Sequence, residues 1–235
     1  RQGRYQMNQS RILVVDDEPQ IQRFLKPSLM AAGYEVVEAG TGAEALKAVA
    51  TQAPDLVILD LGLPDMDGKD VIANLRAWSD IPIVILSARD RESEKIAALD
   101  LGADDYIEKP FGIGELTARI RTALRHRGRR DAIPTVTEID GLTIDPVKRL
   151  VSRAGETVHL TPKEYDLLLL LSRHVGRVVT HRTLLISVWG PAHGDDLHYL
   201  RVFIGQLRQK IEQDPTQPRI VRTEPGVGYR MAEQE

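Results

Sequence analysis

Five short apolar segments that alternate with helical patterns constrain the fold of residues 11–125 more than any other feature of the sequence. Parallel neighbouring strands need helical crossovers and lie buried on both faces, so this alternation predicts an α/β fold with a doubly wound, five-stranded parallel sheet. Pro27 lies inside the first helical pattern, where we expect a kink or a break. The expected strands are 11–15, 34–39, 55–60, 81–88 and 105–109.

The pattern changes after Arg125. Residues 126–135 are highly charged and contain a proline, which is typical of a linker. This linker separates a first domain, residues 7–125, from a second domain, residues 136–233. The second domain begins with short β-like runs, continues with helical patterns, and closes with a hairpin pattern around Pro-Gly-Val-Gly. Its helices are expected within 161–176, 181–190 and 197–213, and its hairpin within 219–231.

The charge distribution differs between the two parts of the chain. Lys and Arg number 15 against 20 Asp and Glu in residues 1–125, and 16 against 14 in residues 126–235. An acidic first part and a basic second part suggest one domain that handles cations and one that meets a polyanion. The chain has no cysteine, which excludes disulfides and thiolate ligands. With no secretory signal and no apolar run near the roughly 20 residues that span a bilayer, we expect a cytoplasmic protein with no membrane contact.

Polar side chains close four of the predicted strands. Asp16 and Asp17 follow the first strand, Asp60 ends the third, Ser87 the fourth and Lys109 the fifth. Ligands of doubly wound sheets bind outside the carboxyl ends of the strands, so we expect these five residues to converge. A single strand-end Asp is usually a turn former or a helix cap, but the coincidence of all five favours a site.

Three close carboxylates repel one another and would raise each other's pKa unless a cation lies among them, and oxygen-only ligands favour Mg²⁺, with Mn²⁺ as an alternative. Gly62 could add a backbone carbonyl to this site. The set suits phosphoryl chemistry: the metal and Lys109 would neutralise phosphate oxygens, Ser87 would donate a hydrogen bond, and Asp60 would attack phosphorus.

Four motifs carry a family resemblance: VVDDE, ILDLGLPDMDG, LSA and KPF. In this order and spacing they resemble the flavodoxin-like receiver domain of two-component response regulators. The resemblance implies that Asp60 accepts a phosphoryl group from a sensor histidine kinase and that Ser87 and Tyr106 form a switch pair. It also implies a phosphate contact by Lys109, a cis Lys109–Pro110 bond, and a Mg²⁺ site made of Asp17 and Asp60 directly, Asp16 through water and the Gly62 carbonyl.

A phosphatase is the enzyme that such a strand-end Asp would suggest. Phosphatases of the haloacid-dehalogenase type use a strand-end Asp nucleophile and a second Asp two residues later, a position that Gly62 occupies here. Without that acid, a stored phosphoryl group is favoured over rapid hydrolysis. We therefore predict a regulator and not an enzyme, with a Mg²⁺-dependent phosphotransfer enzyme as the less favoured alternative.

The charged stretch from residue 95 to 125 resembles the dimer face of the OmpR/PhoB family of response regulators. Exposed charges of this kind usually contribute only about 0 to 1 kcal/mol each. In this family they form reciprocal pairs across a two-fold axis, and the expected pairs are Lys95 with Glu115 and Asp105 with Arg119. The resemblance implies a homodimer when phosphorylated, with an interface of Lys95, Asp104, Asp105, Glu115, Arg119 and Arg121.

The helical pattern at 197–213 has a core face and a basic face. Leu200, Phe203, Ile204, Leu207 and Ile211 recur at helical spacing and should face the core. Arg and Gln on the other face suit a helix in the major groove of double-stranded DNA, with the hairpin as a wing on the backbone. The expected DNA-contacting residues are His198, Tyr199, Arg201, Val202, Gly205, Gln206, Arg208, Gln209, Arg222, Thr223 and Arg230. An ordinary amphipathic helix with a solvated basic face is the alternative.

The second domain resembles the winged-helix effector of the OmpR/PhoB family. This resemblance implies promoter binding, and by analogy it assigns a contact with RNA polymerase to the loop at 189–196. Within the family, the stretches 112–114 and 198–201 are most similar to the activator of a high-affinity potassium-transport operon, whose partner kinase senses potassium and turgor. A sister regulator of another operon is the alternative.

Overall fold

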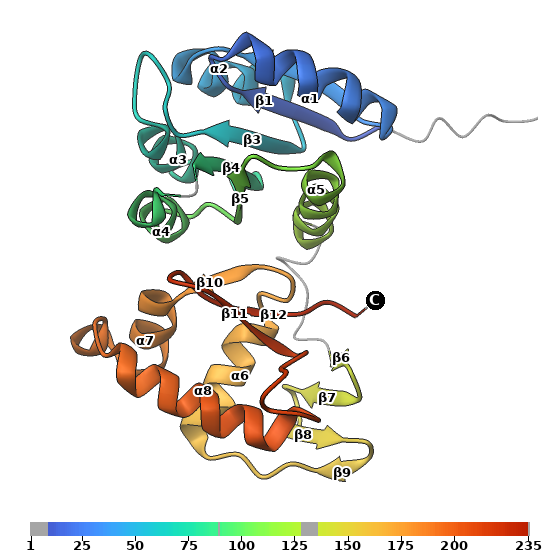
Figure 1. Ribbon diagram of the computed structural model, residues 1–235, viewed down its shortest axis with the longest axis vertical. Helices are drawn as coiled ribbons and strands as arrows, with labels where there is room; N and C mark the ends of the chain where they lie inside the picture. The colour runs from blue at the N-terminus through green and yellow to red at the C-terminus, as the bar shows by residue number, and fades with distance from the viewer. Residues whose placement is uncertain (1–8, 89, 128–135, 235) are drawn as a thin grey trace, which may run out of the picture. The chain divides into compact units, whose positions relative to one another are not determined.

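The computed structural model describes residues 9–88, 90–127 and 136–234, and the chain divides into two compact units with the boundary between residues 129 and 130 (Figure 1). Each unit is described by itself. The last helix of the first unit extends to Arg127, two residues into the predicted linker, and residues 128–135 of that linker lie outside the described residues. Within the described residues, no helix is long and apolar enough to cross a membrane.

The first unit is a parallel sheet with helices on both faces (Figure 1). The strand order is β2-β1-β3-β4-β5, the doubly wound order in which ligands bind at the carboxyl edge. The predicted fold is therefore confirmed. Its elements are β1 (Arg11–Val15), α1 (Pro19–Ala31), β2 (Glu35–Ala39), α2 (Gly42–Gln52), β3 (Leu56–Asp60), α3 (Gly68–Arg76), β4 (Ile83–Ala88), α4 (Glu92–Asp100), β5 (Asp105–Lys109) and α5 (Ile113–Arg127).

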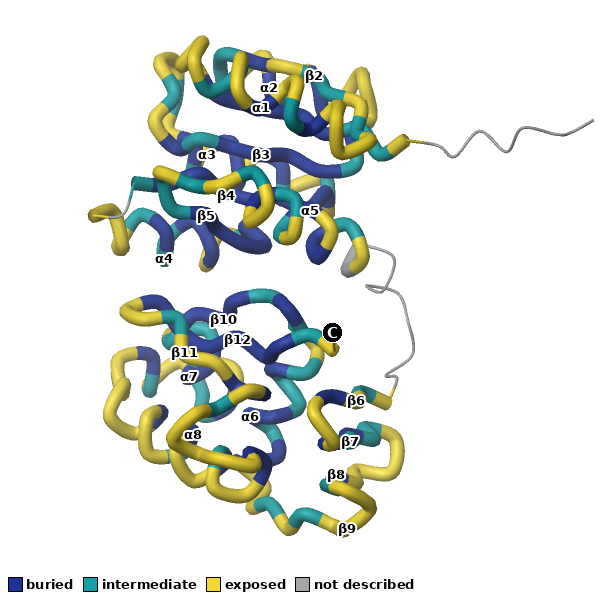
Figure 2. Tube along the Cα trace, turned by 45° about the vertical axis from the view of Figure 1, so that its right-hand side comes forward, coloured by how far each residue is buried: buried dark blue, intermediate teal, exposed yellow. Residues whose placement is uncertain are grey.

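The central strands form the core of this unit, because side chains alternate between the two faces of a strand. Figure 2 shows β3 buried along its length, and its four apolar residues have no exposed surface. Ile58 and its neighbours on one face pack against Leu25 and Leu29 of α1 and Leu116 and Ile120 of α5. The helices α2, α3 and α4 contact one another in sequence order.

Pro27 does not break the first helix. The helix α1 continues from Pro19 to Ala31 through Pro27. The Ser28 hydroxyl donates a hydrogen bond to the Phe24 carbonyl at 2.7 Å, one turn back. The predicted break of the first helix is therefore wrong.

The second unit contains the helices α6, α7 and α8 and two antiparallel sheets (Figure 1). One sheet has the order β6-β7-β8-β9, and the other, β10-β12-β11, contains the predicted hairpin. One apolar cluster joins both sheets to the helices. The elements are β6 (Thr137–Ile139), β7 (Leu142–Asp145), β8 (Leu150–Arg153), β9 (Glu156–Thr157), α6 (Pro162–Ser172), β10 (Val178–Thr180), α7 (His181–Trp189), η1 (Pro191–His193), α8 (Leu197–Ile211), β11 (Val221–Glu224) and β12 (Gly228–Met231).

Candidate functional site

Three carboxylates meet at the carboxyl edge of the parallel sheet. Asp16 and Asp17 directly follow β1 and Asp60 ends β3, and one oxygen of each lies within 4.8 Å of the others. Because β1 and β3 are adjacent parallel strands, residues 44 positions apart reach the same edge. The structure thus brings together the predicted acidic residues, which could hold a metal ion.

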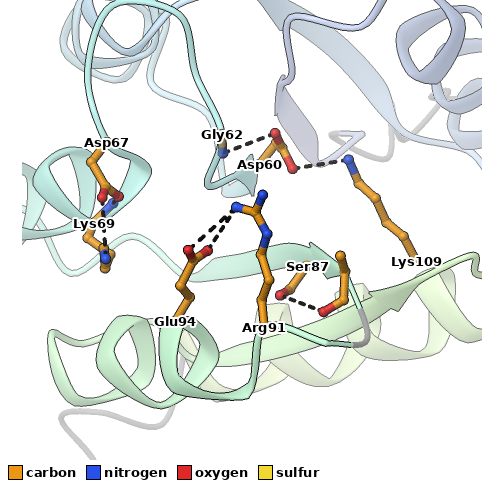
Figure 3. A network of polar contacts seen from close by, with 9 residues as sticks. Asp60, Gly62, Asp67, Lys69, Ser87, Arg91, Glu94 and Lys109 are labelled. Atoms are coloured by element: carbon orange, nitrogen blue, oxygen red, sulfur yellow. Dashed lines mark hydrogen bonds and ion pairs between the residues drawn. The ribbon is translucent and has the colours of Figure 1, made fainter.

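Lys109 reaches this cluster from the end of β5 (Figure 3). Its ammonium lies 3.0 Å from Asp60 Oδ1, 3.5 Å from Asp16 Oδ2 and 3.5 Å from Glu18 Oε1. Burial lowers the pKa of Lys109, but the hydrogen bond to Asp60 and the three carboxylates outweigh it and raise this pKa above its usual value. Glu18 was not predicted, although it directly follows the Asp pair in the sequence.

Asp16 is the buried member of the cluster. Its Oδ1 accepts a hydrogen bond from the Glu18 amide at 2.8 Å, and none of its surface is exposed. Among the described residues, its Oδ2 has no hydrogen-bond partner and only the longer ion pair with Lys109. Burial raises the pKa of Asp16. An oxygen with this unmet demand fits a cation ligand, or an acceptor from a metal-bound water.

The loop after Asp60 is fastened at several points. The Gly62 amide donates to Asp60 Oδ2 at 3.2 Å (Figure 3), and the Gly68 amide donates to the Leu61 carbonyl at 2.9 Å. The carboxylate of Asp65 accepts the amides of residues 42 and 43, the first turn of α2, at 2.8 and 2.9 Å. These bonds lower the pKa of Asp65. The loop therefore holds Asp60 against a fixed backbone.

Ser87 and Tyr106 are both close to fully buried, with 4% and 8% of their surfaces exposed. The Ser87 hydroxyl donates to the neighbouring Ala88 carbonyl at 3.2 Å and not to Asp60 (Figure 3). The Lys95 ammonium lies 5.0 Å from the centre of the Tyr106 ring. The two residues predicted as a switch pair lie on the adjacent strands β4 and β5.

The residues predicted for the dimer face form ion pairs within this chain. The Lys95 ammonium contacts Glu108 at 2.6 Å, and Arg119 contacts Asp105 at 3.2 Å. Asp104 accepts the Ile83 amide at 2.7 Å and pairs at 3.1 Å with Arg76 of α3, a helix outside the charged stretch, so we leave it out of the proposed face. Glu115 and Arg121 are exposed on α5.

The predicted core face of α8 is confirmed: Leu200, Ile204, Leu207 and Ile211 are buried, and Phe203 packs against the same cluster. Figure 2 shows α8 largely exposed between these positions. The exposed residues among those predicted to contact DNA are His198, Tyr199, Arg201, Val202, Gly205, Gln206, Gln209, Arg222 and Thr223.

Two predicted DNA contacts are instead turned toward the protein. Arg230 is 7% exposed, and its guanidinium donates to Glu224 at 2.6 Å and to the Gly176 carbonyl. Arg208 is half-buried and donates to the Val221 carbonyl. We leave Arg230 out of the proposed DNA surface because its guanidinium has protein partners in the interior.

The loop assigned to RNA polymerase contains η1 and lies between α7 and α8. Trp189 ends α7, and its ring makes edge contacts with Tyr199 and Phe203 at centroid distances of 5.4 and 5.0 Å. His193 contacts Asp196 at 2.8 Å. The loop is therefore anchored by aromatic packing on α8, with polar residues on its surface.

Comparison with protein families gives two matches that follow one another along the chain. The family described as "Response regulator receiver domain" matches residues 12–121, and the family described as "Transcriptional regulatory protein, C terminal" matches residues 155–231. The first contains the acidic cluster and Lys109, and the second contains α8 and the hairpin.

Similar proteins cover nearly the whole chain. The KDP operon transcriptional regulatory protein KdpE of Escherichia coli (strain K12) is 52% identical over 93% of this chain and 97% of that protein. The transcriptional regulatory protein KdpE of Mycobacterium tuberculosis (strain CDC 1551 / Oshkosh) is 50% identical, with the same coverage. A crystal structure of the response regulator DrrB, a Thermotoga maritima OmpR/PhoB homolog, is 29% identical, covers 95% of this chain and 99% of that one, and gives a TM-score of 0.50. These relatives are transcriptional regulators and not enzymes, and the chain belongs to the OmpR/PhoB family of DNA-binding two-component response regulators.

Proposed function

We propose that Asp60 accepts a phosphoryl group from a sensor histidine kinase and that this modification controls DNA binding by the second domain. The observation that carries the proposal is the position of Lys109, whose ammonium bridges Asp60 and Asp16 at the carboxyl edge of the sheet. A cation at this position can move onto the oxygens of an incoming phosphoryl group without leaving Asp60. Phosphorylated response regulators act in the compartment of their DNA, so we place the protein in the cytoplasm.

In the proposed transfer, an Asp60 carboxylate oxygen attacks phosphorus. The bond from phosphorus to the histidine nitrogen of the kinase breaks, a phosphorus–oxygen bond forms, and the imidazole leaves as a neutral ring that keeps the proton on its other nitrogen. Asp17 and Asp60 would bind Mg²⁺ (or Mn²⁺) directly, with Asp16 through water and the Gly62 carbonyl as a further ligand. A bound metal would supply positive charge for the phosphoryl oxygens. Lys109 supplies the same kind of charge from the protein, and the fixed loop at Gly62 keeps Asp60 in place.

The signal leaves the pocket through Ser87 and Tyr106 in this proposal. A phosphoryl group at Asp60 offers the Ser87 hydroxyl a stronger acceptor than the Ala88 carbonyl that it now contacts. Movement of Ser87 allows Tyr106 and α4 to shift toward a state that dimerises, which is a change of population and not of fold. The proposed two-fold face comprises Lys95, Asp105, Glu115, Arg119 and Arg121.

The regulated operon is proposed from the relatives. Two proteins at least 50% identical over almost the whole chain are named KdpE, and one of them is described as the regulator of the KDP operon. We propose that this chain activates a potassium-transport (kdp) operon together with RNA polymerase and is phosphorylated by a KdpD-like kinase. The second candidate is a sister regulator of another operon.

A gel shift with a kdp promoter fragment tests both halves of the proposal. The parent should bind more tightly with acetyl phosphate and Mg²⁺, and Asp60→Asn should not respond. Asp70→Asn is the matched control, because it removes an exposed carboxylate from α3, outside the pocket. Equal tightening of Asp60→Asn would overturn the switch, and equal affinity for unrelated DNA would overturn the operon assignment.

A further inference from the structure

We infer that Arg208 is a positioning residue, which joins the DNA-facing helix α8 to the wing hairpin β11–β12 and does not contact a DNA phosphate. From the helical pattern alone, Arg208 is predicted to contact DNA, as are the exposed residues on the same face of α8. The expected effect of Arg208 on DNA binding rests on the proposed function. The hydrogen bonds of Arg208 do not depend on that proposal.

The guanidinium of Arg208 holds β11 at two acceptors. Its Nε and Nη2 donate to the Val221 carbonyl at 3.0 and 2.6 Å, and Nη2 also donates to Thr223 Oγ1 at 2.9 Å. The guanidinium lies over the ring of Tyr229 on β12, with 5.6 Å between Cζ and the ring centre. Arg208 therefore contacts both strands of the wing.

Glu212 lies one turn further along the chain and binds backbone N–H groups at the start of β11 and just before it. Glu212 is 7% exposed, and its carboxylate accepts the backbone N–H groups of Arg219 at 2.9 Å, Ile220 at 3.0 Å and Val221 at 2.8 Å. Val221 thus gives its N–H to Glu212 and its C=O to Arg208. We call Arg208 and Glu212 together the helix–wing clamp.

The clamp acts on the edge of a sheet. In the order β10-β12-β11, the strand β11 pairs with β12 on one side only, so its outward backbone groups need other partners. The clamp supplies them for Val221, from Arg208 of α8 and from Glu212 at its C-cap. This fixes the position of β11 along the helix, and with it the exposed side chains of Arg222 and Thr223 relative to Arg201.

A phosphate contact that moved the guanidinium of Arg208 would break these bonds, and without such movement only the N–H groups of Nη1 remain to donate. Arg208 is half-buried, whereas Arg201 on the same helix and Arg222 on the wing are exposed. Leaving the Val221 carbonyl without a donor costs free energy that Arg201 and Arg222 do not incur when they bind DNA. The geometry therefore favours Arg208 as the residue that presents the other two in a fixed arrangement.

The first test is hydrogen exchange of the full-length protein without DNA. Arg208→Lys keeps the positive charge but cannot hold two acceptors with a planar fork. Backbone amides of β11 should exchange at least about fivefold faster in Arg208→Lys, while α6 and α7 stay protected as in the parent. Arg201→Lys is the matched control and should leave β11 unchanged. Unchanged exchange of β11 in Arg208→Lys and in a second variant, Arg208→Gln, would overturn the inference.

The second test is a double-mutant cycle in DNA binding, followed by fluorescence anisotropy across a salt series. If the clamp presents the wing, Arg222→Ala should weaken binding about two- to tenfold less in the Arg208→Lys background than in the parent. The pair Arg201→Lys and Arg222→Ala should be additive. Additive effects for Arg208 and Arg222 as well, with a salt slope that falls by about one for Arg208→Gln alone, would make Arg208 a phosphate contact and overturn the inference.

The two proposals can fail separately. If Arg201→Ala and Arg222→Ala leave DNA binding unchanged, the proposed DNA surface is wrong, and the exchange of β11 alone decides the role of Arg208. If both variants weaken binding while β11 exchange does not respond to Arg208, the surface stands and the clamp is wrong.

Discussion

The ammonium of Lys95 lies 2.6 Å from the carboxylate of Glu108, and only 3% of the Lys95 side chain is exposed. Lys95 is the residue whose predicted partner is Glu115 of a second copy of the chain. In this structure the ion pair is made within one chain, from α4 to β5. In the proposed dimer, Glu108 would therefore compete with Glu115 of the second copy for the same cation.

Replacement of Glu108 by Gln should strengthen dimerisation. A buried ammonium that loses its counter-ion is costly, so Lys95 should turn outward, where Glu115 of the second copy can pair with it. The two-fold axis doubles the effect, and we expect a dimer dissociation constant about two- to tenfold lower without phosphorylation. Sedimentation analysis measures this. The control is Glu92→Gln on the exposed start of α4, and weaker dimerisation of Glu108→Gln than of this control would contradict the prediction.

Replacement of Asp16 by Asn should separate the effect of Mg²⁺ from the stability of the fold. The parent should gain about 5 °C in Tm at a Mg²⁺ concentration roughly ten times the dissociation constant. Asp16→Asn removes a fully buried charge, so its Tm without Mg²⁺ should be no lower than that of the parent, and its response to Mg²⁺ should be much smaller. Thermal melts with Mg²⁺ and with EDTA measure both quantities. A full Mg²⁺ response in the variant would exclude Asp16 from the metal site.

The carboxylate of Asp65 should make the free energy of unfolding depend on pH. The amides at the start of α2 lower its pKa in the folded protein, so its contribution is complete above the unfolded value of about 3.9 and is lost as pH falls through the lower folded value. Urea unfolding midpoints of the parent and Asp65→Asn should differ most above pH 5 and converge toward pH 3. Asp70→Asn, which removes an exposed carboxylate from α3, is the control for the loss of one negative charge. A difference that stays constant with pH would argue against this role for Asp65.

Gly68 should tolerate no side chain. A Cβ at this position would lie 2.7 Å from Leu61 Cα and 2.9 Å from the Asp60 carbonyl oxygen, both backbone atoms. Gly68→Ala should therefore lower the free energy of unfolding by about 1–3 kcal/mol, with slower labelling of Asp60 by acetyl phosphate. Denaturant unfolding and a labelling assay measure the two effects. Gly114→Ala, where a Cβ has no neighbour within 4 Å, is the control and should be neutral or slightly stabilising.

The acidic cluster was predictable because it depends on topology alone. Parallel strands bring their carboxyl ends to one edge, so Asp16, Asp60 and Lys109 meet there whatever the details of packing. The sheet could also be predicted, because five apolar segments alternate with helical patterns over residues 11–125, and a single departure such as Pro27 does not change that pattern. The strand β10 was missed because three residues carry no usable period.

The directions of the charged side chains could not be predicted from spacing. Arg208 and Arg230 follow the same helical and strand patterns as exposed arginines, but each has a carbonyl acceptor, Val221 or Gly176, that only the folded chain brings near. Lys95 likewise finds Glu108 on the next strand. A pattern of charges thus indicates which face is polar, while the partners in space decide which charges remain available.

The surroundings of Asp60 differ between the α2 side and the β4 side in how firmly they are held. On the α2 side, Asp65 fastens the loop after Asp60 to a helix, and Gly68 packs directly on the backbone of Leu61. On the β4 side, Ser87 makes a hydrogen bond to the carbonyl of its own neighbour, which it can exchange without disturbing another element. Under the proposed function, a displacement that starts at Asp60 would therefore be resisted on the α2 side and would pass toward α4 and β5.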